Sequence, residues 1–327
     1  KNNMTVNKVQ NIDFLKNDLP DKCANLIIAD PPYYKVKGDF DFIWKTFEDY
    51  LLDVKKWCLE CKRILADNGT LFWYGDAKNI AYAQIIFDKH FNLINNLTWN
   101  KGSFMGLEES EGLRSFAPCT ERILMYSKNN DIIENRDLSN SGHLVYMKPT
   151  IDYLRFEREK STFSVNELSK KLNLGKHQLP HYFTYSGFRF PKEKVYNDLK
   201  KITGCFNKNY NDLLKEYEKD KNKYEDLRRP FNNLFNLQEV LNFSNEAVKT
   251  GNNYDHDTVK PETLTRALIL TRSRKNDLVV VPFAGSGTEC AMSAKEKRPF
   301  MGYEITEKHA KMSQERANKI LKEPTLF

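Results

Sequence analysis

Hydrophobic and polar positions along residues 1–128 follow two patterns. Apolar residues recur at every third or fourth position over 47–65 and 77–90, which predicts two amphipathic helices. Short apolar runs before and after them predict strands at 25–29, 70–75, 92–101 and 121–128. Strands that alternate with helices indicate a parallel α/β sheet.

The pattern changes between residues 129 and 255. Long apolar strands disappear, and Lys, Asn, Tyr and Phe dominate. Residues 164–183 predict a helix, a turn at Gly175 and a second short helical element, which is the order of a helix-turn-helix. Residues 207–231 predict a highly charged helix, and most of its charges suit a solvated face.

The α/β pattern returns from residue 256. Residues 260–273 predict an amphipathic helix with a proline in its first turn. A strand, a glycine turn and a helix follow over 277–297, and a strand and a long helix over 299–321. The chain is therefore expected to hold two α/β parts that flank an unlike, mostly helical insert, with boundaries at 1–128, 129–255 and 256–327.

Composition narrows the class of protein. Hydrophobic residues make up 40% and charged residues 29% of the 327, which is typical of a soluble globular chain rather than a disordered one. A net charge of +7 favours a polyanionic partner. No run approaches the roughly 18 to 20 apolar residues of a membrane span, and the polar start lacks a signal-peptide core, so no membrane partner and a cytoplasmic location are expected.

The six cysteines are scattered and do not indicate a disulfide framework. Cys58 and Cys61 have C-x-x-C spacing, but they lie inside a predicted amphipathic helix, and no second Cys/His pair follows at zinc-site distance. We expect both to be packing residues and expect no metal.

The turn in "VVVPFAGSGTECA" places Gly285 and Gly287 between a strand and a helix, where glycine lets the backbone approach a ligand. No lysine precedes Thr288, so a phosphate-binding P-loop does not fit, and Cys290 stands where a dinucleotide motif has its third glycine. Glu304 ends the next strand, 17 positions after Gly287, where an acid can accept hydrogen bonds from ribose hydroxyls. An adenosine-containing cofactor without a pyrophosphate is indicated. The alternative for Glu304 is a surface acid at a helix N-terminus.

The stretch "LIIADPPYYK" is a buried strand that ends in an acid, two prolines and two tyrosines. With this motif first and "FAGSG" much later, the chain resembles the beta-class N6-adenine DNA methyltransferases, which carry a D-P-P-Y motif, a target-recognition region and an F-x-G-x-G motif in that order. The resemblance extends over roughly 200 residues and includes Trp99, Lys101 and Glu121 in the strand motifs and Lys260-Pro261 before the cofactor motif. One departure is Ile12-Asp13, where the family often has Gly-Asp.

The resemblance implies a Rossmann-like methyltransferase fold in permuted motif order and S-adenosylmethionine as cofactor. Two acceptors, the Asp30 carboxylate and the Pro31 carbonyl, would localise the lone pair of the adenine amine, and Pro32 helps to fix that carbonyl. Tyr33 would stack on the extruded base. Tyr34 is a second candidate, and a plain loop residue is the favoured alternative for it. The expected cofactor contacts are Asp13, Asp30, Lys260, Phe283, Ala284, Gly285, Ser286, Gly287, Thr288 and Glu304. For Asp13, Lys260 and Thr288, an ordinary surface or capping role is the alternative.

The insert is expected to read double-stranded DNA. The candidate contacts to phosphates and bases are Lys176, His177, Gln178, His181 and Arg189. Tyr182, Phe183 and Tyr185 are expected in a core instead. A homodimer and a cognate restriction endonuclease are further candidate partners. The alternatives left open are an N4-cytosine DNA or RNA methyltransferase and a DNA-binding regulator on a methyltransferase scaffold.

Overall fold

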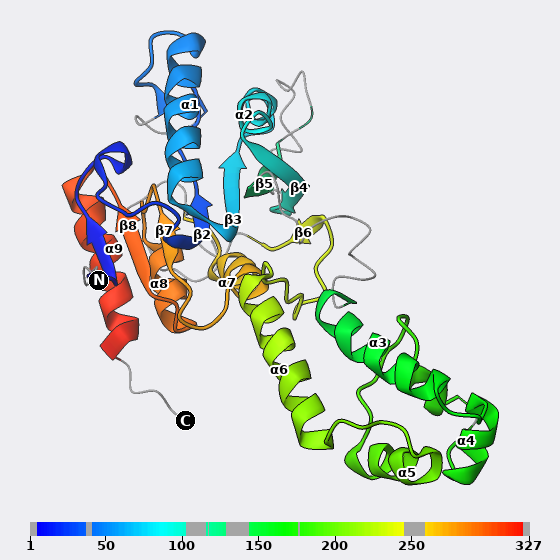
Figure 1. Ribbon diagram of the computed structural model, residues 1–327. Coiled ribbons are helices and arrows are strands. Elements are labelled where there is room, and N and C mark those ends of the chain that lie inside the picture. Colours follow the sequence, from blue (N-terminus) through cyan, green and yellow to red (C-terminus); the bar gives the residue numbers. More distant parts are fainter. Residues whose placement is uncertain are drawn as a thin grey trace. The chain divides into compact units, whose positions relative to one another are not determined.

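The computed structural model describes residues 5–36, 41–102, 116, 118–128, 144–175, 177–244 and 259–322. The chain forms two compact units, which are best considered separately (Figure 1). The first comprises residues 1–131 and 229–327, and the second comprises residues 132–228.

The first unit is built on an eight-stranded sheet in the order β1-β8-β7-β2-β3-β5-β4-β6. Its strands are β1 (Lys8–Gln10), β2 (Ala24–Ala29), β3 (Leu65–Gly75), β4 (Phe91–Asn100), β5 (Thr120–Lys128), β6 (Val240–Asn242), β7 (Val279–Val281) and β8 (Phe300–Tyr303). Of these, β5 alone runs opposite to its neighbours β3 and β4. The expectation of a purely parallel sheet is therefore wrong at this one strand, which pairs antiparallel with both β3 and β4.

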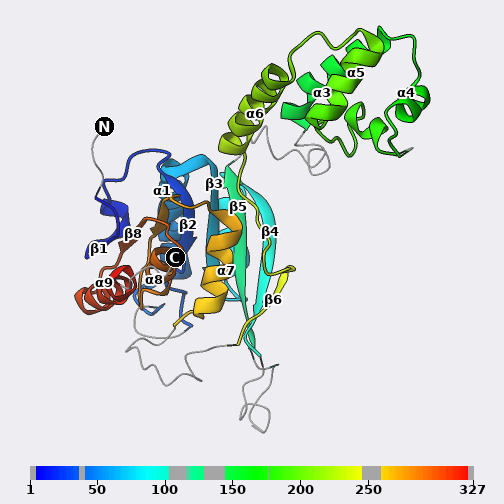
Figure 2. The same ribbon diagram turned by 90° about the horizontal axis from the view of Figure 1, so that it is seen from below.

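Helices cover both faces of the sheet, and successive strand residues point to opposite faces. Ile27 and Trp73 pack into the cluster that includes α1 (Phe47–Ile64) and α2 (Ile80–Phe87). Leu26 and Phe72 pack into the cluster beneath α7 (Glu262–Arg272), α8 (Thr288–Lys295) and α9 (Glu307–Lys322) (Figure 2). The central strands are buried on both sides, which explains why they appear in the sequence as continuous apolar runs.

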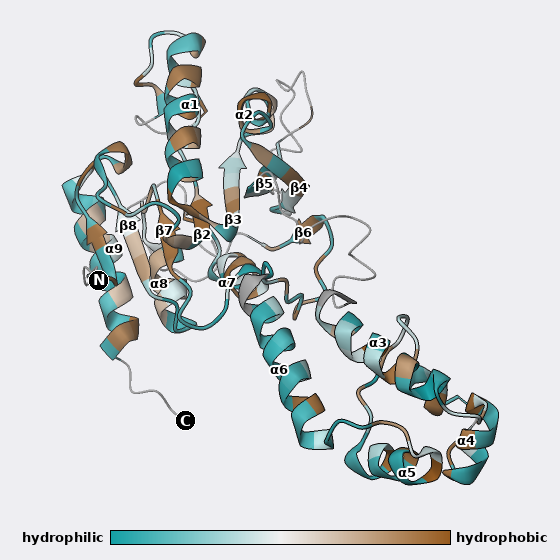
Figure 3. Cartoon of the chain, viewed as in Figure 1, coloured by the Kyte–Doolittle hydropathy of each residue, from teal (hydrophilic) through white to brown (hydrophobic). Residues whose placement is uncertain are grey.

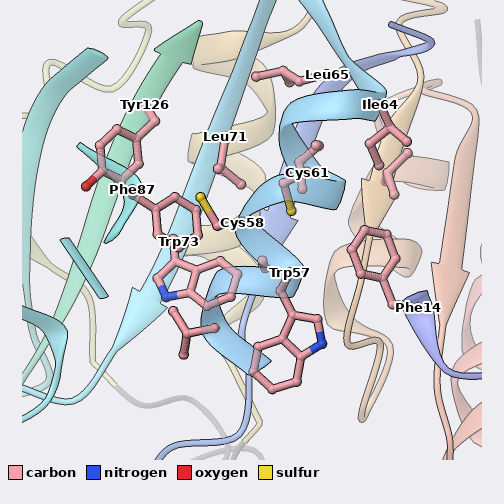
Figure 4. Close-up of a cluster of buried hydrophobic side chains, with 14 of the residues drawn as sticks. Phe14, Trp57, Cys58, Cys61, Ile64, Leu65, Leu71, Trp73, Phe87 and Tyr126 are labelled. Carbon is pink, nitrogen blue, oxygen red and sulfur yellow. The ribbon is translucent and has the colours of Figure 1, made fainter. Parts of the chain in front are cut away.

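The two cysteines of the C-x-x-C pair lie in the core. Cys58 and Cys61 are both fully buried on α1, next to Trp57 and Trp73 (Figure 4). Burial raises the pKa of the Cys58 thiol to about 12 and that of Cys61 well above its usual value, so both remain protonated. Their expected packing role is confirmed.

The middle of the sheet contains the point where the chain reverses its direction of winding. β2 continues through α1 to β3 on one side, and β7 continues through α8 to β8 on the other. β2 and β7 are parallel neighbours, with Leu26 opposite Val279 and Ile27 opposite Val280. Ligands of open α/β sheets bind at the carboxyl ends of such neighbouring strands.

The second unit is helical. It contains α3 (Leu144–Glu159), α4 (Val165–Lys171), α5 (Glu193–Thr203) and α6 (Tyr210–Leu227), with a one-turn 3₁₀ helix η4 (Leu179–Tyr182). Ser164 and Glu167 form a reciprocal capping box at the start of α4. The unit has its own core around Leu154, Tyr196 and Phe206. The charged helix α6 is largely hydrophilic along its length, as expected (Figure 3).

Two expectations about the insert need correction. The second element of the helix-turn-helix pattern is only the four-residue η4, which is too short to act as a groove-reading helix. The insert also ends near residue 228 rather than 255. Arg229 donates hydrogen bonds to the Gly69 and Asp67 carbonyls, and β6 adds to the sheet beside β4. The return of the chain to the sheet at β6 could not be predicted from the sequence, because β6 is only three residues long.

Candidate functional site

A cavity of about 640 Å³ lies at the carboxyl ends of β2 and β7. The loop after β2 contributes Asp30–Tyr33 to its wall, and the loop after β7 contributes Pro282–Ser286. Its wall also carries more acids than bases. The carboxyl groups are Asp13, Asp30, Asp41, Asp53, Asp76, Glu121, Glu289 and Glu304, and the lysines are Lys56, Lys101 and Lys260.

Asp30 is held by two donors. Lys260 Nζ lies 2.6 Å from Asp30 Oδ2, and the Tyr33 hydroxyl donates to Asp30 Oδ1 at 2.6 Å. Lys260 is only 5% exposed. Its burial disfavours the ammonium, but the carboxylates of Asp30 and Glu121 outweigh that effect and raise the pKa of Lys260. Lys260, expected as a cofactor contact, instead binds the carboxylate of Asp30, the catalytic candidate.

Glu121 joins this network from β5. Its Oε1 accepts from Lys101 at 3.1 Å, and its Oε2 lies 3.4 Å from the ammonium of Lys260. Burial raises the pKa of Glu121, but the two lysines outweigh burial and hold it below its usual range. Asp30, Lys260, Glu121 and Lys101 therefore form a line of alternating charges. The resemblance named Lys101 and Glu121, but it assigned them no role.

The loop after β2 is fixed by a residue that the sequence analysis missed. Asp41 is 2% exposed, and its carboxylate accepts a hydrogen bond from the Tyr33 backbone N–H at 2.5 Å. The Asp41 carbonyl accepts from the N–H of Lys35. Tyr34 turns away from the cavity and packs against Phe47 and Tyr50. The candidate role of Tyr34 as a second stacking aromatic is therefore wrong, because its ring is held in a packed aromatic cluster.

The glycine turn lies beside this loop with the predicted geometry. Gly285 and Gly287 have φ values of 46° and 80°. The Gly285 N–H donates to Glu304 Oε2 at 2.9 Å, and Glu304 Oε1 accepts from Thr306 N–H. Glu304 therefore lines the cavity with its carboxylate held by two backbone donors, and each oxygen keeps a further acceptor site.

Other cofactor candidates divide into two groups. Asp13 lines the cavity and also caps a short 3₁₀ helix, η1 (Phe14–Lys16), by accepting from Leu15 N–H at 2.9 Å. Phe283, Ala284 and Ser286 line the cavity as expected. Thr288 does not: it is fully buried, and its hydroxyl accepts from Arg316 at 2.9 Å. Gly287 also lies outside the cavity wall.

Glu289, in the first turn of α8, was not anticipated. It lines the cavity at 5% exposure, and its Oε1 has no hydrogen-bond partner among the described residues. Burial, followed by the nearby Asp30 carboxylate, raises the pKa of Glu289 to about 7. The sequence held no signal for this role, because an acid in a first helical turn is common for reasons of the helix dipole alone.

The residues expected to read DNA lie in the second unit. His177, Gln178 and Arg189 are exposed, and His181 is half-buried. Lys176 lies outside the described residues. Tyr182 and Phe183 are buried and Tyr185 packs against that same core, as expected.

The fold is that of the S-adenosylmethionine-dependent methyltransferases. Solved structures with the same fold include TTHA0409 of Thermus thermophilus with S-adenosyl-L-methionine bound, at a TM-score of 0.52 and 16% identity over 96% of this chain and 94% of that one. PvuII DNA methyltransferase, a cytosine-N4-specific enzyme, is similar at a TM-score of 0.52 and 11% identity, over 97% of this chain and 92% of that one.

Sequence comparison defines the family. The profile of the N6/N4 DNA methylases matches residues 24–315, and the chain belongs to this DNA methylase family. Similar curated proteins include the type II methyltransferase M.HpaI of Haemophilus parainfluenzae, 25% identical over 93% of this chain and 71% of its own length. DNA adenine methyltransferase YhdJ of Escherichia coli is 24% identical over 90% of this chain and 76% of its own length.

A further relative is the probable type III restriction-modification enzyme HindVI Mod subunit of Haemophilus influenzae, 25% identical over 91% of this chain. The chain spans about half the length of that protein, 48%. Across the described residues, no helix is long and apolar enough to cross a membrane.

Proposed function

We propose that the protein transfers a methyl group from S-adenosylmethionine to N6 of an adenine in duplex DNA. The observation that carries this proposal is the position of Asp30. It stands at the switch point between β2 and β7, on the same cavity as the glycine turn, although some 250 residues separate the two motifs. The order of Asp30 loop, insert and glycine turn supports assignment to the beta class of the family.

The cavity suits the cofactor in three respects. Gly285 brings backbone close to the space and holds Glu304 for the ribose hydroxyls. The aromatic ring of Phe283 offers an apolar wall for an adenine ring. The excess of carboxyl groups suits a cation, and S-adenosylmethionine supplies a methyl group activated by a positively charged sulfonium.

Asp30 and Pro31 are proposed to orient the reacting amine. The amine is a weak nucleophile because its lone pair is delocalised into the ring, and acceptors on its N–H groups localise that pair. Asp30 has lone pairs beyond those bonded to Lys260 and Tyr33, since an ionised carboxylate offers about four acceptor sites. These two donors hold the carboxylate in one orientation, so that positioning and electrostatics lower the barrier.

Tyr33 and Pro32 are proposed to support the base. A base in a duplex must be extruded before its amine can enter the cavity. The Tyr33 backbone is anchored by Asp41, and its hydroxyl by Asp30, so the ring is pre-positioned beside the acceptor. Burial, and next the Asp30 carboxylate, raise the pKa of Tyr33, so its hydroxyl stays a donor at neutral pH. Pro32 limits movement of the same loop.

The exposed His177, Gln178 and Arg189 support a role for the second unit in DNA contact. His181 and Lys176 complete that proposed set. The curated relatives include a type II methyltransferase and the Mod subunit of a probable type III restriction-modification enzyme, and these names support a cognate endonuclease as partner. A homodimer remains a further proposal from the family resemblance.

The test is incubation of the protein with methyl-labelled S-adenosylmethionine and unmethylated genomic DNA, followed by nucleoside analysis. We expect label in N6-methyladenine. Label in N4-methylcytosine would replace the proposed substrate with the base of the PvuII enzyme, and no label in either nucleoside would refute the function.

Asp30→Ala is the matching variant. It should abolish transfer while S-adenosylhomocysteine still binds within about threefold, because the carboxylate acts on the base. Asp67→Asn, at an exposed acid that does not line the cavity, is the control and should transfer normally. Normal turnover by Asp30→Ala would remove Asp30 from the mechanism.

A further inference from the structure

Glu289 is a buried acid that the proposed mechanism does not use. It comes from the first turn of α8, directly after the glycine turn, and it lines the cavity together with Asp30. Only 5% of it is exposed, and its Oε1 has no hydrogen-bond partner among the described residues. An unpaired carboxyl oxygen at this depth costs free energy unless a ligand supplies the partner.

The charged groups around Glu289 are already paired with one another. Lys260, before α7, is bonded to Asp30 and lies within 3.4 Å of Glu121. Arg316, from α9, is bonded to Glu262 at 2.6 Å and to the Thr288 hydroxyl. Both cations lie close enough to act on Glu289, but each has a carboxylate partner of its own.

Two uncharged neighbours of Glu289, Tyr74 of β3 and Cys290 of α8, add no positive charge. Tyr74 of β3 is uncharged, and burial, with the Glu289 carboxyl next, raises its pKa well above the usual value. The buried Cys290 thiol is likewise protonated, because burial raises its pKa. Ionised Glu289 is therefore a surplus negative charge, on a wall where acids already outnumber lysines.

We propose that Glu289 makes the site prefer positively charged S-adenosylmethionine over the neutral S-adenosylhomocysteine that remains after transfer. This inference rests on the proposed function. The donor carries a sulfonium, an ammonium and a carboxylate, a net charge of +1, and the demethylated product carries a net charge of zero. Ionised Glu289 balances the donor, and protonated Glu289 balances the product.

This proposal also predicts when Glu289 gains and loses its proton. The carboxyl has a pKa of about 7 in the free protein, so near neutral pH about half of the molecules carry the proton. Binding the cation ionises Glu289 and releases that proton. Loss of the sulfonium charge on methyl transfer lets Glu289 take a proton back from solvent, and this favours exchange of product for fresh donor.

Titration calorimetry of the full chain tests the proposal, with S-adenosylmethionine and S-adenosylhomocysteine as ligands at pH 7. The wild type should bind the donor more tightly. Glu289→Gln keeps the shape of the side chain and removes its charge, and it should weaken donor binding about tenfold while leaving product binding within twofold. Glu262→Gln removes an acid near Arg316 that does not line the cavity, and it should keep the wild-type ratio of the two affinities.

Repeating the titrations in two buffers of different ionisation enthalpy counts protons. We expect about half a proton released when the wild type binds the donor at pH 7, none when it binds the product, and none from Glu289→Gln with either ligand. The wild-type preference for the donor should also rise between pH 5.5 and 8, a measurement that needs no variant.

The possible outcomes separate the two proposals. A protein that binds neither ligand would overturn the proposed function together with the role of Glu289. A protein that methylates DNA but whose donor preference is unchanged by Glu289→Gln and by pH would overturn only the role of Glu289. Normal product binding by Glu289→Gln would confirm that its cavity is intact.

Discussion

The variant Gly287→Ala, which adds a single methyl group, tests the geometry of the glycine turn. The φ of Gly287 is +80°, and a Cβ added there would lie 2.5 Å from Ser313 Oγ and 2.6 Å from Ser313 Cα. Left-handed backbone costs a non-glycine residue about 1–2 kcal/mol. Overpacking against a neighbouring helix adds about 1–3 kcal/mol. We therefore expect Gly287→Ala to lower the free energy of unfolding by about 2–5 kcal/mol.

Gly102→Ala is the matched control, because Gly102 has a φ of +83° and no described residue lies within 4 Å of an added Cβ. Its free energy of unfolding should fall only by the cost of the left-handed backbone, about 1–2 kcal/mol. Urea denaturation followed by tryptophan fluorescence makes the comparison, since all four tryptophans and both glycines lie in the first unit. Equal losses in the two variants would refute the steric argument.

A second variant separates the contacts at this position. Ser313→Ala removes the hydroxyl nearest to the added methyl but leaves the Cα at 2.6 Å. The double variant should therefore recover only part of the stability lost by Gly287→Ala. Full recovery would mean that the backbone contact with α9 relaxes without cost, and that the close approach of α8 and α9 does not require glycine.

Two further predictions concern pH and salt. Because the pKa of Glu289 is raised from 4.5 to about 7 in the folded protein, the stability tied to its neutral form is complete below about pH 4.5 and is lost as pH rises through 7. That difference in pKa corresponds to about 3 kcal/mol. Between pH 4.5 and 7.5 the free energy of unfolding of Glu289→Gln, measured by urea denaturation, should therefore rise by roughly that much relative to the wild type. Parallel pH profiles of the two proteins would contradict the raised pKa of Glu289. Affinity for a DNA duplex should fall steeply between 50 and 200 mM salt, because phosphate contacts release counterions. A flat dependence in a fluorescence anisotropy titration would exclude phosphate contacts by the exposed basic residues.

Periodicity predicted local structure well wherever an element is long. The helices over 47–65 and 207–231 correspond to α1 and α6, and the apolar runs at 25–29 and 121–128 correspond to β2 and β5. It could not predict the direction of β5, because alternating burial is the same for parallel and antiparallel strands. Nor could it find β6, whose three residues contribute too short a pattern.

The candidate site shows a similar division. Asp30, Gly285 and Glu304 could be named because strand-end acids and glycine turns have local signatures. Asp41 and Glu289 have none, since their importance comes from burial and from neighbours distant in sequence. Thr288 was assigned to the cofactor, but it is held inside the protein by Arg316, 28 positions later.

The sequence by itself determined which segments carry chemistry: an acid after one buried strand, a glycine turn after another, and an unlike insert between them. The tertiary structure decided what these segments do to one another. Pairing of β2 with β7 brings Asp30 and Gly285 to one cavity. Folding also brings the ammonium of Lys260 into contact with the Asp30 carboxylate. It leaves the Glu289 carboxyl buried, with no hydrogen-bond partner for Oε1 among the described residues. Charge interactions depend on distance and burial in three dimensions, and neither quantity can be read from positions along the chain.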